Sequence, residues 1–230
     1  MLRTLTTAAT AATALLALAP AAAAQDAGNW SFAFGAATDN RSKSLSKSDG
    51  DPFAWAEAEW ESASGLFYAG PSFETVKSNG SELEVALVAG VRPQFAGFDL
   101  DLSAKHKWLV DADPATDDDA WEFTADVKRS IGPARARLRL QHSPDTLGAG
   151  DGWTWYEAQV GWDFTHKLSA SAALGRREQE TSVDYTGYNI GVSYALTRTA
   201  ELDLRWYGND ADVPGEQYSD GLVAGISFAF

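Results

Sequence analysis

Residues 221–230 read Gly-Leu-Val-Ala-Gly-Ile-Ser-Phe-Ala-Phe, and every second residue of this stretch is apolar. The apolar positions are Leu222, Ala224, Ile226, Phe228 and Phe230. A period of two places these side chains on one face of a β-strand. A last strand that finishes on an aromatic residue is typical of outer-membrane β-barrels. The stretch therefore predicts that the rest of the chain repeats its pattern.

The first 24 residues have the pattern of a secretory signal. Arg3 is the only early charge, and an Ala-, Leu- and Thr-rich stretch follows it up to Pro20 and the small residues Ala22–Ala24. A transmembrane helix needs roughly 18 or more apolar residues, and this stretch is shorter and broken by Pro20. We therefore predict a signal peptide over residues 1–24 and export of residues 25–230.

The composition limits what the exported chain can be. No second apolar run is long enough for a helix in lipid, so strands must do any membrane spanning. The mean hydropathy of −0.25 fits strands that keep one face in water. The absence of cysteine excludes a disulfide scaffold and any thiolate site. The net charge of −14 argues against nucleic acid as a partner.

Alternating segments recur along the whole mature chain. About twelve runs have period-two patterning and the spacing of an all-β barrel. We therefore predict an all-β fold, a closed antiparallel transmembrane barrel of about 12 strands that forms one domain over residues 25–230. The apolar faces of the predicted strands lie within residues 30–34, 54–60, 67–73, 83–91, 98–104, 121–127, 134–140, 156–164, 168–174, 188–196, 202–206 and 222–230.

The connections between these runs alternate in length, as they do in outer-membrane barrels. The long connections are expected at residues 39–52, 76–81, 111–119, 143–152, 177–183 and 208–219, and the tight ones at 61–64, 92–97, 130–133, 165–167 and 197–200. The acidic, Gly- and Pro-rich tracts fall mostly in the long set, which suits solvated loops outside the membrane. Pro71 and His106 make the strand register around them uncertain, because Pro71 removes a ladder donor and His106 falls on the apolar face.

The first long connection and the second strand after it carry a recognisable series of motifs. Thr38-Asp-Asn-Arg41 is followed by Ser46-Lys-Ser-Asp-Gly-Asp-Pro52 and then by Gly65-Leu-Phe-Tyr-Ala-Gly70. This series resembles the TorF family of porin-like proteins, which are small proteobacterial outer-membrane proteins. The chain departs from the family pattern at Asn40 and Ser44. The resemblance implies a barrel and a pore, with no catalytic residues to carry over.

The inward face of one strand is rich in arginine, at Arg135, Arg137 and Arg139. One interpretation is a ladder of cross-strand ion pairs that fills the lumen. The other is a basic stripe that faces an acidic one and selects charged solutes. The residues predicted to line a pore are Arg135, Arg137, Arg139 and Arg205 on the basic side, and Glu57, Glu84, Glu122 and Glu157 on the acidic side.

The size of such a barrel favours a narrow channel. About twelve strands spaced ~4.8 Å apart and tilted by ~40° give a backbone diameter of roughly 24 Å, and side chains reduce the lumen to the order of 10 Å. Trp60 and Trp206 fit the aromatic girdles of a membrane barrel, and Trp153 and Trp155 fit either a girdle or a stacking surface at the channel mouth.

Catalytic and metal sites are poorly supported by the sequence. His142 is followed by Ser143 and Asp145, but these residues fall at a strand end and in a loop, so no catalytic set is predicted. The acidic tracts lack the ligand order of a Ca²⁺ loop. We expect no cofactor and no resident metal.

The sequence thus predicts a porin-like channel in the outer membrane of a Gram-negative cell, for passive transport of small hydrophilic or charged solutes. Its partners would be outer-membrane lipid and these solutes, and the sequence leaves the oligomeric state open. The alternative is a non-conducting barrel whose acidic extracellular loops bind a surface partner or a divalent ion. A lipid-modifying enzyme is the third possibility.

Overall fold

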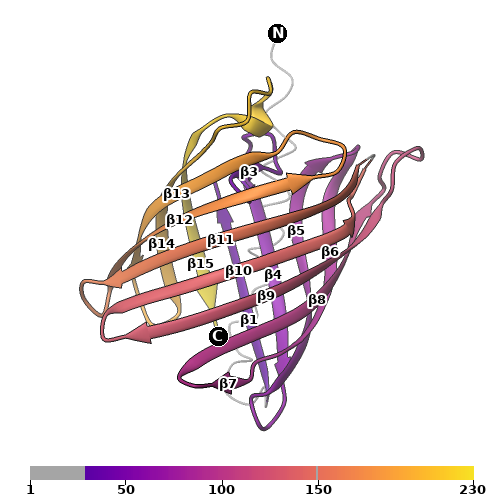
Figure 1. The fold of residues 1–230 in the computed structure, drawn as a ribbon. Helices are drawn as coiled ribbons and strands as arrows, with labels where there is room; N and C mark the ends of the chain where they lie inside the picture. The colour runs from indigo at the N-terminus through magenta and orange to yellow at the C-terminus, as the bar shows by residue number, and fades with distance from the viewer. Residues whose placement is uncertain (1–28, 149) are drawn as a thin grey trace.

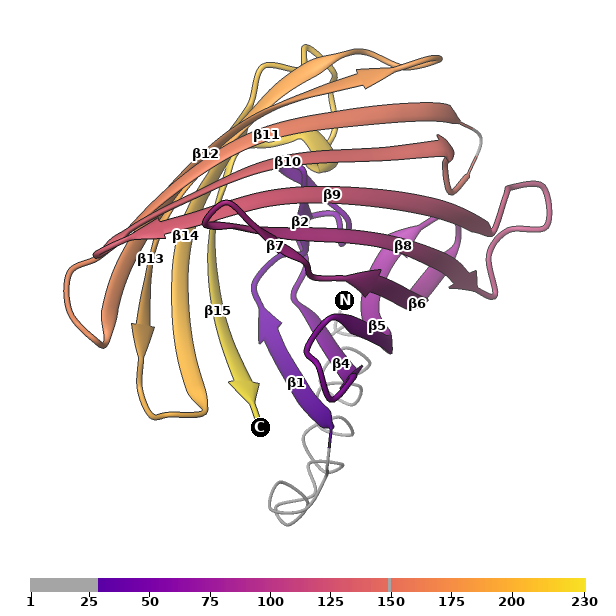
Figure 2. The same ribbon diagram turned by 60° about the horizontal axis from the view of Figure 1, so that its bottom comes forward.

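The computed structural model describes residues 29–148 and 150–230, and these form a closed antiparallel β-barrel of twelve strands (Figures 1 and 2). The predicted signal peptide lies outside the described residues. The barrel strands are β1 (Trp30–Ala37), β4 (Phe53–Glu61), β5 (Phe67–Ser78), β6 (Ser81–Val91), β8 (Phe98–Val110), β9 (Asp119–Ile131), β10 (Ala134–Asp145), β11 (Asp151–Asp163), β12 (Leu168–Gln179), β13 (Tyr185–Ala195), β14 (Ala200–Asn209) and β15 (Gly221–Ala229).

Each barrel strand pairs with the next one along the chain, and β1 pairs with β15 to close the wall. Three short strands lie outside the ring of twelve: β2 (Arg41–Ser42) and β3 (Leu45–Ser46) form a hairpin of their own, and β7 (Gln94–Phe95) folds back on β8. A 3-10 helix, η1 (Glu216–Tyr218), lies between β14 and β15. Within the described residues, no helix has the length and apolar character that crossing a membrane requires.

The predicted sorting of connections holds as a tendency. The six connections at one end of the barrel, here called the loop end, have 15, 2, 8, 5, 5 and 11 residues, and the five at the opposite turn end have 5, 6, 2, 4 and 4 residues. The prediction of a long connection at residues 76–81 is wrong. Strands β5 and β6 are joined by only Asn79 and Gly80, whose φ angles of 50° and 79° give the two-residue turn that Asn-Gly favours.

Strand β5 is irregular at two positions. It runs unbroken from Phe67 to Ser78 and keeps one register against β4 on both sides of Pro71, but the pairing with β4 is interrupted at Gly70 and Pro71. The register against β6 also shifts between Thr75 and Ser78, next to the Asn-Gly turn. The proline is tolerated because the ladder to β6 continues past it.

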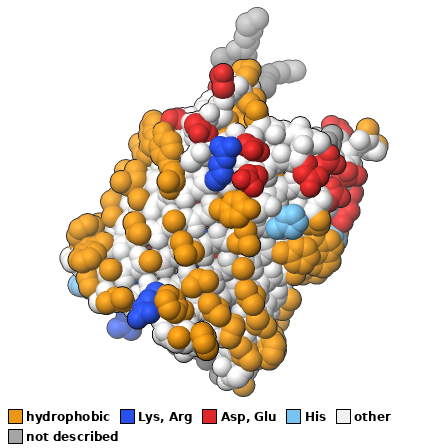
Figure 3. Space-filling model, in the orientation of Figure 1, with side chains coloured by type: hydrophobic (Ala, Val, Ile, Leu, Met, Phe, Trp, Pro, Cys, Tyr) orange, Lys and Arg blue, Asp and Glu red, His pale blue; other side chains and the backbone are white. Residues whose placement is uncertain are grey.

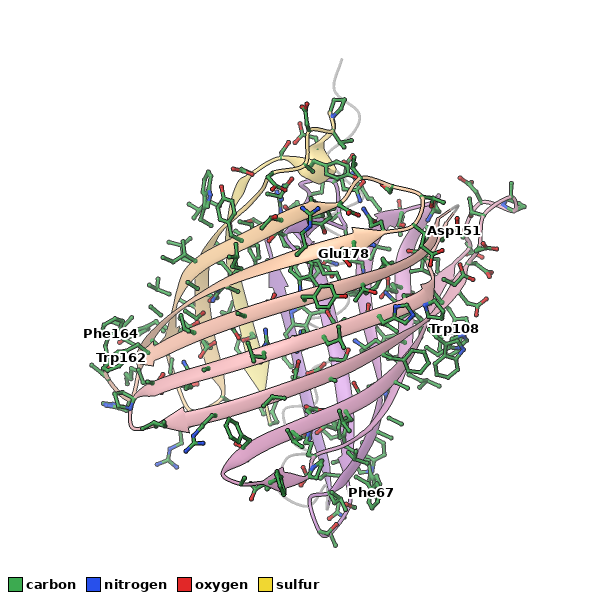
Figure 4. The ribbon with its side chains drawn as sticks, in the orientation of Figure 1. Phe67, Trp108, Asp151, Trp162, Phe164 and Glu178 are labelled. Atoms are coloured by element: carbon green, nitrogen blue, oxygen red, sulfur yellow. The ribbon has the colours of Figure 1, made fainter. Side chains whose placement is uncertain are left out.

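The outer wall is apolar because each strand turns its alternate apolar residues outward (Figure 3). Aromatic side chains project from it towards both ends of the barrel: Phe67, Trp162 and Phe164 at the turn end and Trp108 at the loop end (Figure 4). Acidic side chains gather at the loop end (Figure 3). His106 does face outward, as the alternation predicts. Its ring lies 4.2 Å from that of Trp108 and 4.5 Å from that of Trp121, and its Nε2 is 2.7 Å from Asp119.

Candidate functional site in the barrel interior

The first long connection, residues 38–52, folds into the barrel instead of extending away from it, and we call it the inner loop. Six of its residues are buried: Asp39, Asn40, Ser44, Leu45, Ser46 and Ser48. The loop contains the β2–β3 hairpin, whose two-residue turn has Lys43 and Ser44 at φ angles of 52° and 67°. This left-handed pair reverses the chain at the deepest point of the loop.

A network around Asp39 holds the base of the inner loop. Its carboxylate accepts hydrogen bonds from the hydroxyls of Ser46 (2.5 Å) and Ser48 (2.9 Å), and it forms an ion pair with Arg41. Arg41 in turn donates to the backbone oxygen of Ser219, 2.5 Å away. The serines therefore serve as local hydrogen-bonding partners, which lets a polar loop be buried with its groups satisfied.

The tip of the hairpin reaches across the barrel. The hydroxyl of Tyr185 on β13 donates to the backbone oxygen of Lys43 (2.9 Å), and Ser44 lies so close to Gly187 that a methyl group there would be 2.8 Å from it. The Nζ atom of Lys43 is 3.1 Å from Oε2 of Glu122 on β9. The hairpin is thus attached to well-separated strands and narrows the interior at the loop end.

An aromatic cluster packs beside the hairpin. Leu45 of the inner loop lies against Trp153, Trp155 and Tyr185, all of which are buried. Of the two interpretations of Trp153 and Trp155, the membrane girdle is therefore wrong, because both side chains point into the barrel. The ring of Trp155 lies over Gly175 of β12, where any larger side chain would overlap it. Gly175 is thus the residue that lets the indole lie flat against the wall.

The two lysines of the inner loop have opposite electrostatic environments. Burial lowers the pKa of Lys43 to about 7, although Glu122 opposes the shift. Burial also favours the neutral form of Lys47, but Glu74 and Glu84 outweigh it and raise the pKa of Lys47. Lys47 is 2.7 Å from Glu84 and also pairs with Glu74. Lys47 therefore stays charged, whereas Lys43 titrates near neutral pH.

The predicted arginine stripe is present on the inner face of β10, and each arginine has an acidic partner. Arg135 is 2.8 Å from Asp163, Arg137 is 2.6 Å from Glu157, and Arg139 binds both carboxylate oxygens of Asp126 at 2.7 Å. This geometry is that of a cross-strand ion-pair ladder, the first of the two interpretations of the stripe.

The other predicted site residues are spread around the interior. Arg205 on β14 lies 3.1 Å from Asp203 and also donates to Asn189 and Ser171. Glu57 on β4 is exposed within the barrel, away from the arginine ladder. Glu84 and Glu122 are buried against lysines of the inner loop, so the structure joins them to the loop and not to the stripe.

The charged groups of β9 and β10 are most exposed at the turn end and are buried beside the inner loop. The side chain of Arg135 is 49 % exposed, and those of Arg137 and Arg139 are 24 % and 27 % exposed. The side chain of Glu122, nearer the inner loop, is 8 % exposed. Water therefore reaches the charges at the turn end and is largely displaced beside the inner loop.

One part of the inner wall is built from small residues. The inward positions of β15 and β1 alternate with the apolar outward ones, and most of them carry Gly, Ala or Ser. These small residues are Gly221, Gly225, Ser227, Ala229, Ser31, Ala33, Gly35 and Ala37. They occupy the side away from the arginine ladder, where the indole of Trp55 lies against Gly35 and the guanidinium of Arg41 lies against Gly221.

A cavity of about 380 Å³ lies at the loop end beside the hairpin. The inner loop and inward residues of several strands line it, including Lys43, Lys107, Trp153 and Arg177. Of these four residues, the sequence singled out only Trp153, as part of a stacking surface at the channel mouth. Arg177 was expected at the start of the long connection at residues 177–183, whereas the structure places it at the inward end of β12. Nothing in the sequence indicated that the first loop would fold in to meet these residues.

The described part of the chain shows no cluster of three or more His, Cys, Asp or Glu side chains placed to hold a metal ion.

A scan against protein families matches residues 21–225 to a family described as "Bacterial protein of unknown function (Gcw_chp)". The chain belongs to the Gcw_chp family. This membership covers the inner loop and all of the barrel strands except the end of β15. Among curated proteins, none matches the sequence.

Several solved structures share the fold. The KdgM porin has a TM-score of 0.61 at 8 % identity, with 87 % of this chain and 99 % of that chain covered. The NanC porin has a TM-score of 0.58 at 8 % identity, with coverage of 86 % and 98 %. An outer membrane channel from Pseudomonas putida F1 has a TM-score of 0.55 at 10 % identity, with coverage of 87 % and 93 %. At these identities the similarity establishes the barrel fold alone.

Proposed function

We propose that this Gcw_chp protein is an outer-membrane channel for passive diffusion of small hydrophilic or charged solutes. The observation that carries the proposal is the division of the wall: the outer face is apolar with aromatic residues towards both ends, and the inner face is charged and hydrated at the turn end. A closed barrel of this kind satisfies its backbone hydrogen bonds in lipid and encloses a polar interior.

Two similarities support the proposal. The motifs of the inner loop resemble the TorF porin-like family. The solved structures that share this fold include proteins named as porins. One structure of the KdgM porin is described as a complex with disordered oligogalacturonate. Export would depend on the signal peptide predicted for residues 1–24. The loop end would then face outward and the turn end the periplasm.

The predicted pore-lining residues have distinct roles in this proposal. Arg135, Arg137 and Arg139 with their acidic partners, which include Glu157, would form one charged side of the path, and Arg205 and Glu57 would add charge elsewhere on the inner wall. Glu84 and Glu122 would fix the inner loop and so set the narrowest point. No cofactor, energy source or catalytic residue is required, and the partners are outer-membrane lipid and the solutes.

Planar-bilayer recording tests the channel directly. The full chain should give discrete conductance steps, and a variant in which a short Gly-Ser linker replaces residues 41–48 should give steps several-fold larger, because the hairpin no longer narrows the interior. Arg137→Glu should shift ion preference towards cations. Arg176→Glu is the matched control, since Arg176 is on the outer face of β12, and it should leave ion preference unchanged. Absence of conductance in both the full chain and the linker variant would contradict the proposal.

A second candidate function is favoured by the buried ion pairs of the inner loop. If Lys43, Lys47 and Arg41 keep the hairpin in place, the barrel could be non-conducting, with its acidic loops binding a surface partner or a divalent ion. The linker variant separates the two functions. Steps in the variant with none in the native chain would favour the closed barrel.

A further inference from the structure

The cavity at the loop end has an excess of positive charge although the protein as a whole is strongly acidic. Three cations lie close together on its lining: Lys43 of the inner loop, Lys107 of β8 and Arg177 of β12. The nearest carboxylate to them is Glu122, whose Oε2 is 3.1 Å from Lys43 and 3.5 Å from Lys107. One carboxylate therefore faces three cations.

The acceptor capacity of Glu122 is already used. Its Oε2 atom receives both lysines, and its Oε1 accepts a hydrogen bond from Gln141 at 3.0 Å. Two carboxylates lie on the cavity lining itself: Glu84, which is 2.7 Å from Lys47, and Asp49, which is exposed and whose charge acts on Lys77. These contacts leave Arg177 without an acidic partner among the described residues.

Arg177 is held in place by an aromatic ring and not by an ion pair. Its guanidinium carbon lies 4.7 Å from the centre of the Trp153 ring, and Nζ of Lys43 lies 4.2 Å from the same ring. The Nε of Arg177 is buried and has no hydrogen-bond partner in the described structure. A buried donor without a partner is costly, and so is a cation without a counter-charge. Both costs are removed if an anion occupies the cavity.

We propose that this cavity binds small carboxylate anions, with Lys43, Lys107 and Arg177 as the binding residues and Trp153 as the apolar wall. A guanidinium presents paired N–H donors that match a carboxylate, and the two ammonium groups add charge. The cavity volume of about 380 Å³ is within the range of small-molecule sites. The site names a solute class for the proposed channel, and its role in transport rests on that proposed function.

The acidic loops do not prevent anion binding at this position. Their carboxylates are mainly exposed, and salt screens exposed charges beyond about 8 Å at physiological ionic strength. The cations of the cavity are partly or fully buried, so they are screened much less. The local excess of positive charge therefore dominates for an anion that has entered the cavity.

Equilibrium dialysis of the full chain in detergent against radiolabelled succinate tests the site. We expect saturable binding of succinate and none of succinamide, which has the same carbon skeleton without charge. Arg177→Gln should weaken binding by about tenfold or more, the usual effect of losing a hydrogen bond between charged groups. The matched control is Arg176→Gln, which removes the same charge from the outer face of the same strand and should bind as the native chain does.

Lys107→Gln provides a second test on a different strand, with circular dichroism to confirm that each variant is folded. Equal binding of succinate by the native chain and by folded Arg177→Gln and Lys107→Gln variants would overturn the proposal, as would the absence of saturable binding to the native chain. Bilayer recording separates this outcome from failure of the channel. Conductance without succinate binding would contradict only the proposed anion site. Succinate binding without conductance would contradict only the proposed channel.

Discussion

The two ends of the barrel interior handle charge in different ways. At the turn end, Arg135 and Asp163 pair with about half of each side chain exposed. At the loop end, Lys43 and Glu122 pair with their side chains more than nine-tenths buried, beneath a folded-in hairpin. The same barrel therefore uses ion pairs for two purposes. Hydrated pairs keep a passage polar at little energetic cost, and buried pairs fix a loop in position.

The largest expected difference between the two ends is in stability. Glu122→Gln leaves Lys43 and Lys107 buried without a carboxylate, so we expect the free energy of unfolding to fall by about 3 kcal/mol. Asp163→Asn removes a hydrated partner of Arg135 and should cost less than about 1 kcal/mol. Urea unfolding in phosphocholine vesicles, followed by tryptophan fluorescence, measures both. Equal losses would show that the two ends do not differ in this way.

Packing should differ between the two ends as well. Gly175→Ala introduces a methyl group that overlaps the ring of Trp155, so we expect a loss of about 1–3 kcal/mol. Gly161→Ala at the turn end is the matched substitution, because the added methyl group would be 3.5 Å from its nearest neighbour. It should be neutral or stabilising by up to about 1 kcal/mol, since glycine is unfavourable within a strand. The same unfolding measurement gives the free energy of unfolding of both variants. If Gly175→Ala does not lower it, the loop end is loosely packed.

The smallest effect should be a dependence on pH that is confined to the loop end. Burial lowers the pKa of Lys43 to about 7, so Lys43 is charged below this pH and neutral above it. The charged and titratable groups around it are Glu122, Lys107, Arg177 and the hydroxyl of Tyr185. Succinate binding should therefore weaken a few-fold between pH 6 and pH 8.5.

The variant Lys43→Met should bind succinate more weakly than the native chain and with no such pH dependence. If the variant and the native chain respond to pH equally, another group titrates. The effect on stability has the opposite sign. The unfolded chain keeps the Lys43 proton up to the ordinary pKa of lysine, so between about pH 7 and pH 10.5 this group makes the folded state more stable as the pH rises.

Most of the barrel follows from the sequence because period two is a local property of the chain. The alternation in residues such as 83–91 predicted both the strand and its outward face, and twelve such segments predicted the closed barrel that the structure has. The error at residues 76–81 came from drawing β5 too short, although Asn79-Gly80 is itself a strong signal for a two-residue turn.

The site followed from the sequence only in part. The arginines of β10 were recognisable because they alternate within one strand. The inner loop was not recognisable as a plug, since Lys43 and Glu122 are 79 residues apart and nothing local specifies their pairing. Trp153 and Trp155 have the composition of a membrane girdle, and only the positions of Leu45 and Tyr185 show that they belong to the interior.

The seam between β1 and β15 has a consequence for assembly. It joins Ala33–Ala37 to Gly225–Ala229, whereas every other neighbouring pair in the wall is consecutive or nearly so along the chain. Eleven neighbouring pairs can therefore form progressively, but the ring is completed only by a contact that spans almost the whole sequence, which is entropically the slowest to form. Until that moment two unpaired strand edges remain available to other chains, and this exposed intermediate is the stage at which the protein most needs protection.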